Sequence, residues 1–201
     1  MKRTPSWILS LVALAGLLFV STFTYAQNEK LIKRLQTSTT VLNEIMGIPE
    51  KGVPRYLLAG AAGVVVFPSV VKAGFIVGGR YGKGVVSYRD KRTGRWSPPA
   101  FLTIGGGSIG YQIGVQATDL VMIITSRRGI EGLLRSKFTL GGDASIAAGP
   151  VGRRVEASTD ILLKAEIYSY SRTKGLFAGV SLEGAVISHD NEANRSFYGR
   201  P

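Results

Sequence analysis

The sequence has no cysteine and a single histidine, His189, among its 201 residues. The absence of cysteine excludes disulfide bonds and thiol catalysis, and it removes the lipid-modified cysteine that tethers a bacterial lipoprotein. Zinc and other transition metals lack their usual ligands, because they bind mainly through histidine and cysteine. The acidic residues do not have the spacing of a calcium loop. The sequence therefore predicts no metal centre and no cofactor.

Acidic residues are also scarce. There are 13 Asp and Glu against 25 Lys and Arg, so the formal net charge is +12. Electrostatics alone then favour anionic partners, although a basic surface can also serve solubility.

Long apolar runs are missing except near the start of the chain. Residues 7–20 form an apolar run that follows Lys2 and Arg3 and is shorter than the roughly 20 residues that cross a bilayer. It precedes the small-x-small sequence Thr24-Tyr25-Ala26. This pattern predicts a cleaved secretory signal peptide over residues 1–26, with an uncleaved anchor as the alternative.

The expected mature chain is then a single domain over residues 27–201, periplasmic or secreted, with a net charge of +10 once Lys2 and Arg3 are removed (12 minus 2). In that compartment the abundant polyanions are membrane surfaces and envelope polymers, so nucleic acid is not an expected partner.

The chain begins with helical patterns and continues with strand patterns. Apolar residues recur at helical spacing over residues 28–46, and Pro54 is well placed to begin a short helix over residues 55–59. Later runs rich in Val, Ile, Tyr and Phe are separated by glycine. The sequence predicts strands over residues 64–67, 74–81, 84–88, 100–104, 109–115, 120–124, 140–148, 161–170 and 176–187, a charged hairpin tip over 89–96, a turn over 171–175, and short helices over 128–134 and 191–198.

This order predicts an α+β fold, in which N-terminal amphipathic helices precede a glycine-rich, strongly curved antiparallel or barrel-like sheet with short helices. Residues 120–124 are expected to be the central strand, because all five are strongly apolar.

Three patterns suggest catalysis or nucleotide binding and are set aside. Gly105 to Gly110 match G-x-G-x-x-G, but a strand pattern follows where a dinucleotide site needs a helix. Ser188, His189 and Asp190 are immediate neighbours, so they cannot converge as a hydrolase triad. Glu166 and Glu183 fall on strands expected to pair, which leaves an acid and base pair geometrically open, but cross-strand basic partners are favoured.

Several blocks along the chain resemble the SYLF domain family, a lipid-binding module also found in a yeast actin-organising protein and in SH3-linked eukaryotic relatives. The resemblance spans about residues 41 to 198 and follows the family order. The blocks are VVKAGF (70–75), GRYGKG (79–84), WSPPA (96–100), GYQIG (110–114), LGGD (140–143), AAGPVGR (147–153), YSYSRTKGLFAG (168–179) and NRSFYG (194–199).

The resemblance implies non-catalytic binding of anionic phospholipid, phosphoinositides in the eukaryotic relatives, with an amphipathic helix contributing to membrane contact. We predict a headgroup surface of Lys72, Arg80 and Lys83, a second contact of Lys91, Arg92 and Arg95 at the hairpin tip, and Lys30, Lys33 and Arg34 on a helix that inserts Leu31, Leu35 and Leu42. Packing of that helix on the sheet is the alternative.

Actin is not an expected partner for an exported chain. A second hypothesis is an envelope protein that holds another protein or an anionic polymer. A third is a hydrolase that uses Glu166 and Glu183.

Overall fold

The computed structural model describes residues 27–47, 53–135, 137–150, 165–173, 176–180 and 182–199. The predicted signal peptide and its cleavage site therefore lie outside the described residues, and so does the predicted strand start at residues 161–164.

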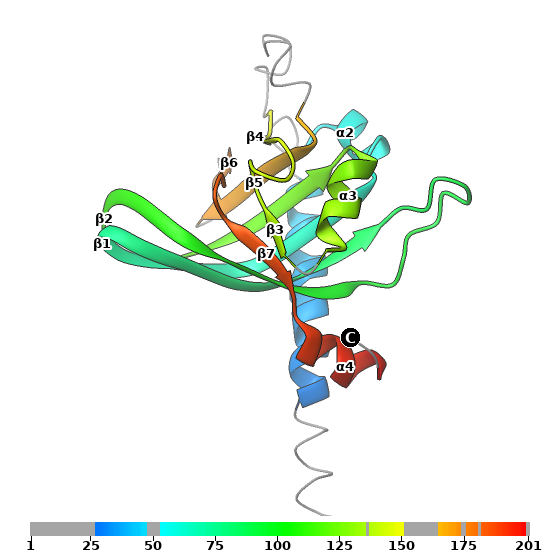
Figure 1. The fold of residues 1–201 in the computed structure, drawn as a ribbon, viewed down its shortest axis with the longest axis horizontal. Helices are drawn as coiled ribbons and strands as arrows, with labels where there is room; N and C mark the ends of the chain where they lie inside the picture. Colours follow the sequence, from blue (N-terminus) through cyan, green and yellow to red (C-terminus); the bar gives the residue numbers. More distant parts are fainter. Residues whose placement is uncertain are drawn as a thin grey trace, which may run out of the picture.

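Both predicted N-terminal helices are present. Residues 27–46 form the N-terminal helix, and α2 (Arg55–Ala59) follows Pro54. Leu31, Val41 and Ile45 share the apolar stripe of the N-terminal helix and are buried against the sheet. Figure 1 shows this helix, in blue, behind the sheet with its lower end beside α4 (Asn191–Tyr198). The stripe therefore serves as core, as the packing alternative predicted.

Two very long strands dominate the sheet. β1 (Gly63–Tyr88) and β2 (Ala100–Ile124) pair antiparallel from Gly63 opposite Ile124 to Val86 opposite Ala100. The prediction of several short strands was wrong here, because the pairing continues through the glycines, with two register shifts instead of turns. A bent ribbon replaces the expected set of hairpins.

The ribbon folds back on itself where glycine permits close approach. A methyl group on Gly82 would lie 2.7 Å from Cγ2 of Val70, and one on Gly84 would lie 2.3 Å from the carbonyl oxygen of Val66. The N–H of Arg89 donates to the carbonyl of Ala62 at 2.8 Å. The second half of β1 thus lies against its first half, and Figure 1 shows β1 and β2 turning together at the left of the molecule.

The shorter strands complete a seven-stranded sheet of order β3-β7-β2-β5-β4, with β1 on β2 and β6 on β5. Among the strand pairs of the described residues, β4–β5 is parallel and the others are antiparallel. Residues 120–124 lie between β1 and β5, which confirms the predicted central strand. The strands are β3 (Lys137–Thr139), β4 (Ile146–Ala148), β5 (Ile167–Thr173), β6 (Leu176–Gly179) and β7 (Val186–His189).

Two strand predictions were wrong because glycines with positive φ interrupt them. Gly141, at φ 86°, divides the predicted strand 140–148 into a turn followed by β4. Gly184, at φ 75°, divides the predicted strand 176–187 into β6 and β7. An L-residue rarely adopts these angles, so the chain turns there. β5 also extends to Thr173, into the turn predicted for residues 171–175.

The other two predicted helices are confirmed as α3 (Arg127–Leu133) and α4 (Asn191–Tyr198). Each begins at a side-chain cap: Ser126 Oγ accepts from the N–H of Gly129, and the Asp190 carboxylate accepts from the N–H of Ala193. Such caps satisfy amide groups that have no partner inside the helix.

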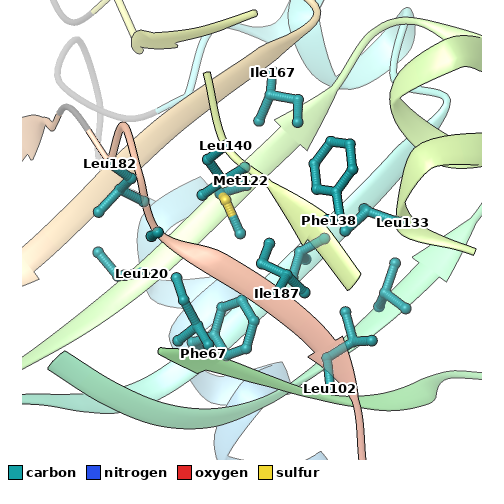
Figure 2. Packing of buried hydrophobic residues seen from close by; sticks show 14 of the residues in the cluster. Phe67, Leu102, Leu120, Met122, Leu133, Phe138, Leu140, Ile167, Leu182 and Ile187 are labelled. Carbon is teal, nitrogen blue, oxygen red and sulfur yellow. The ribbon is translucent and has the colours of Figure 1, made fainter. Parts of the chain in front are cut away.

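The curved sheet has apolar clusters on both faces, which confirms the α+β prediction. One cluster joins α3, β3 and β7 to β1 and β2, and Figure 2 shows Phe67, Met122, Phe138 and Ile187 converging within it. The other joins the N-terminal helix, α2 and α4 to the opposite face. Among the described residues, no helix is both long and apolar enough to span a membrane.

Candidate functional site

Among the described residues, basic side chains are most closely spaced in the connection between β1 and β2. We name residues 89–96 the basic loop; its four cations are Arg89, Lys91, Arg92 and Arg95, and its one acidic residue is Asp90. All of these side chains are exposed. The net charge of this segment is therefore +3 (four minus one), at the predicted hairpin tip.

Internal hydrogen bonds order the basic loop. The Asp90 carboxylate accepts from the N–H groups of Arg92 and Thr93 at 2.9 and 2.8 Å and from the Thr93 hydroxyl at 3.1 Å. Hydrogen bonds from the backbone and hydroxyl of Thr93 lower the pKa of the Asp90 carboxyl. Gly94 closes the turn at φ 69°. Because Asp90 binds the loop itself, its carboxylate does not pair with the neighbouring cations.

One loop cation is structural. Arg89 donates from Nε to the carbonyl of Gly94 at 3.0 Å and from Nη1 to that of Ala59 at 3.1 Å, which fixes the loop to α2. Within the described part of the chain, the side chains of Lys91, Arg92 and Arg95 form no hydrogen bond or ion pair. These three remain available to an external anion.

Two aromatic side chains stand at the base of the basic loop. Tyr88 is 43% exposed and Trp96 is 46% exposed. Ser97 holds this base closed, since its N–H donates to the Tyr88 carbonyl at 2.8 Å and its hydroxyl accepts from the Tyr88 N–H at 3.1 Å. Exposed tyrosine and tryptophan beside cations are typical of groups that sit at the headgroup level of a membrane.

The strand cations Lys72, Arg80 and Lys83 do not form one surface. Strand alternation places residue 80 on the face of Val86 and residue 83 on the face of Val85, and these two valines belong to opposite clusters. Lys72 is half-buried further along β1, opposite Gln116. Lipid binding by these residues stays a prediction, but they cannot act together as one flat site.

Arg80 is unusual among the strand cations. Its Nε is the one buried side-chain nitrogen or oxygen without a hydrogen-bond partner in the described part of the chain. Burial lowers the pKa of its guanidinium. A buried donor without an acceptor costs about 1–3 kcal/mol, so this position would gain from an added anion or water.

The helix cations divide into exposed and paired residues. Lys30 and Lys33 are exposed, whereas Arg34 forms an ion pair with Asp190 at 2.9 Å and lies 5.3 Å from the centre of the Phe101 ring. Lys83 reaches the same carboxylate at 3.7 Å. Arg34 is therefore committed to joining the N-terminal helix to α4, and insertion of Leu31 into a bilayer would require this helix to leave the sheet.

The two carboxylates considered for hydrolysis, Glu166 and Glu183, lie in different segments and have different contacts. Glu166 accepts from the Ser126 hydroxyl and the Ser145 N–H, both at 3.1 Å. Glu183 lies in the turn before β7, with its Cγ 3.1 Å from where a Cβ on Gly141 would be. The predicted antiparallel pairing of these two segments is confirmed for β5 and β6. Neither carboxylate lies on the paired strands, because β5 begins at Ile167 and β6 ends at Gly179.

The neighbours Ser188, His189 and Asp190 also do not converge. His189 Nε2 lies 2.8 Å from the carbonyl oxygen of Leu133, at the end of α3, whereas Asp190 caps α4 and binds Arg34. No group of three or more histidine, aspartate or glutamate residues within the described ranges is placed to hold a metal ion.

Comparison with known proteins shows the family to which this chain belongs. Residues 105–201 match the profile of a family described as "Ysc84: Las17-binding protein actin regulator". Over 176 residues the chain is 39% identical to SH3 domain-containing YSC84-like protein 1 from Xenopus laevis, which covers 87% of this chain and 51% of that protein. The chain carries a Ysc84-family domain. The resemblance to SYLF domains, another name for this family, is thereby confirmed.

Other relatives of the Ysc84 domain give the same result. The human SH3 domain-containing YSC84-like protein 1 is 40% identical over 151 residues, 75% of this chain and 44% of that protein. Protein YSC84 from Saccharomyces cerevisiae is 40% identical over 160 residues, 78% of this chain and 34% of that protein. The chain thus spans about half the length of these curated relatives or less.

Three residues of the candidate site were not predicted as binding residues. Trp96 was only part of the predicted hairpin tip, and Tyr88 and Asp190 were given no binding role. The two aromatic residues that flank the basic segment 89–95 are a signal that could have indicated Tyr88 and Trp96. The pairing of Asp190 with Arg34, 156 positions apart, leaves no local pattern.

Proposed function

We propose that the domain binds membrane surfaces rich in anionic phospholipid, without catalysis, and that the basic loop makes the first contact. One observation carries this proposal: three exposed, unpaired cations, Lys91, Arg92 and Arg95, lie on an ordered loop whose base carries exposed Tyr88 and Trp96. The cations would neutralise lipid phosphates, and the aromatic rings would lie at the headgroup level.

The expected strength of this contact is modest. A lysine or arginine near an anionic membrane contributes about 1 kcal/mol, so the three cations give about 3 kcal/mol, which salt would weaken. The two aromatic side chains add apolar contact. Further cations such as Lys30 and Lys33 would strengthen the attraction over a larger area. The proposed binding is therefore peripheral and reversible.

Family membership supports a binding role. Ysc84-family proteins are generally non-catalytic binding proteins, and the SYLF resemblance implies lipid as a ligand. The part of the chain that the structure describes offers no converging catalytic set that would favour an enzyme instead.

The test is co-sedimentation of the expected mature chain, residues 27–201, with vesicles of phosphatidylglycerol and phosphatidylcholine, and with vesicles of phosphatidylcholine alone, at low and high salt. The proposal predicts binding to the anionic vesicles that high salt weakens, and little binding to the neutral vesicles. Binding that is equal on both vesicles and indifferent to salt would contradict it.

We also propose that the chain acts outside the cytoplasm, because residues 1–26 have the pattern of a cleaved signal peptide. N-terminal sequencing of protein from an envelope or culture fraction tests this. A mature chain that starts at Gln27 would support export, whereas protein that retains residue 1 and stays with the cytosol would contradict it.

A second candidate is a protein partner, and the family description favours it because it names Las17 binding. An exported chain would use the same basic face to hold an acidic envelope protein or an anionic polymer. This candidate predicts a stable complex in pull-downs from envelope extract together with no vesicle binding, so the vesicle experiment separates the two.

A further inference from the structure

An apolar groove lies between the N-terminal helix and the sheet, next to the basic loop. It has a volume of about 370 Å³ and is lined by Leu35, Ser38, Thr39 and Leu42 from the helix, Val64, Val66, Val85 and Ser87 from β1, and Trp96 and Pro99 from the hairpin connection. None of these ten residues is charged. The volume is within the roughly 300–1,000 Å³ of small-molecule sites.

The three hydroxyl groups that line the groove already donate within the protein. The Ser38 hydroxyl donates to the carbonyl of Arg34 at 2.8 Å, and that of Thr39 donates to the carbonyl of Leu35 at 3.0 Å. The Ser87 hydroxyl donates to the carbonyl of Ser97 at 2.8 Å. All three hydroxyl protons are used within the protein. A ligand would therefore be apolar along the whole length that lies inside.

The groove borders the basic loop, whose cations have the opposite character. Trp96 lines the groove and directly follows Arg95, the last cation of the basic loop. A ligand with an anionic end would keep that end outside, where Lys91, Arg92 and Arg95 can bind it. An apolar chain that ends in an anionic group fits both parts, and this is the chemistry of a lipid acyl chain with its headgroup.

We propose that the groove takes one acyl chain of an anionic lipid while the basic loop holds the headgroup. The inference rests on the proposed function but goes beyond surface contact, since a single lipid would be partly lifted out of the bilayer. The N-terminal helix then has a second role: it forms one wall of a lipid site instead of inserting into the membrane.

Trp96 provides the probe. The chain has two tryptophans, Trp7 and Trp96, so Trp7→Phe leaves Trp96 alone. The full chain with this change is titrated with 9,10-dibromostearate, whose bromine atoms quench tryptophan on contact, and with unbrominated stearate as competitor. We expect saturable quenching at one fatty acid per protein, reversed by stearate. Only non-saturable quenching, or none, would overturn the proposal and point to another occupant such as a protein segment.

Two adjacent threonines give a matched pair of variants. Thr39 and Thr40 are both exposed and both bind the carbonyl four residues earlier, but only Thr39 lines the groove. Thr39→Phe should fill the groove and weaken dibromostearate binding at least tenfold, whereas Thr40→Phe should leave it unchanged. Equal binding by the two variants would overturn the inference, and thermal unfolding of both confirms that each is folded.

Vesicle co-sedimentation of the same proteins separates this inference from the proposed function. Salt-sensitive vesicle binding without saturable Trp96 quenching would refute the groove and leave surface binding intact. Saturable quenching without vesicle binding would support the groove and refute surface binding.

Discussion

Asn194 makes both of its side-chain hydrogen bonds to the backbone of one residue, Phe101. The N–H of Phe101 donates to Oδ1 of Asn194 at 2.8 Å, and Nδ2 of Asn194 donates to the carbonyl of Phe101 at 3.1 Å. Asn194 is only 5% exposed, and the Phe197 ring packs edge-on against that of Phe101 at 5.4 Å. This pairing fixes α4 to the second residue of β2, close to the basic loop.

Removal of this side chain should therefore be costly. Asn194→Ala leaves the buried N–H of Phe101 without its acceptor and should lower the free energy of unfolding by about 2–3 kcal/mol. Asn191→Ala changes an exposed residue of the same helix and should cost less than about 1 kcal/mol. Urea unfolding of both variants gives the comparison. Equal stabilities would show that the Asn194 pairing does not hold the helix.

The fold-back of β1 makes a prediction about glycine. A Cβ on Gly84 would lie 2.3 Å from the Val66 carbonyl oxygen, whereas one on Gly107 would meet nothing within 4 Å. Gly84→Ala should therefore destabilise the protein by about 1–3 kcal/mol, and Gly107→Ala should be neutral or slightly stabilising. Thermal unfolding compares the two. A neutral Gly84→Ala would contradict the close contact between the two halves of the strand.

Asp190 has two roles that substitutions can separate. It caps α4, and its carboxylate, 9% exposed, pairs with Arg34, 13% exposed. Asp190→Ala removes both roles and leaves Arg34 without its partner, so we expect a loss of about 2–4 kcal/mol. Asp190→Asn keeps a capping oxygen and should lose about half as much. If the two variants unfold at the same urea concentration, the ion pair contributes nothing.

Buried tyrosines predict a loss of stability at high pH. Burial, followed by the nearby Tyr56 and Tyr168, raises the pKa of Tyr170 above its ordinary value of about 10, and burial also raises that of Tyr168. The unfolded chain releases these protons at lower pH than the folded protein does. The free energy of unfolding is therefore unaffected below about pH 10 and falls as the pH rises above it.

Tyr170→Phe tests this dependence. The substitution removes one titrating group, so stability should fall less steeply above about pH 10, by up to about 1.4 kcal/mol per pH unit. The control is Tyr81→Phe, at an exposed site, which should keep the wild-type slope. Urea unfolding from neutral to strongly alkaline pH measures both. An unchanged slope in Tyr170→Phe would contradict the account.

Local patterns predicted the helices well because their causes are local. The apolar spacing over residues 28–46, Pro54 before α2 and the pattern of α4 all lie within one element. Strand lengths were harder to predict. A glycine can continue a strand in close contact with another segment, as Gly82 does, or lie in a turn with positive φ, as Gly184 does. A single sequence does not show which of the two occurs.

For the candidate site, too, local features could be predicted from the sequence and features that depend on tertiary packing could not. The basic loop could be predicted because four cations and a turn signal are adjacent in sequence. The separation of Arg80 from Lys83 depends on strand alternation and could have been anticipated. The ion pair between Arg34 and Asp190 and the groove beside Trp96 form only when the N-terminal helix packs on the sheet, so the sequence alone did not indicate them.

The most direct test of the central claim is vesicle binding by two variants of equal charge. One changes Lys91, Arg92 and Arg95 of the basic loop to Glu. The other changes Arg128, Arg135 and Lys137, which are also exposed and lie in or next to α3, to Glu. The account predicts that the loop variant loses at least 100-fold in affinity for phosphatidylglycerol vesicles and that the other variant loses only a few-fold. Equal losses, or unimpaired binding by the loop variant, would contradict it.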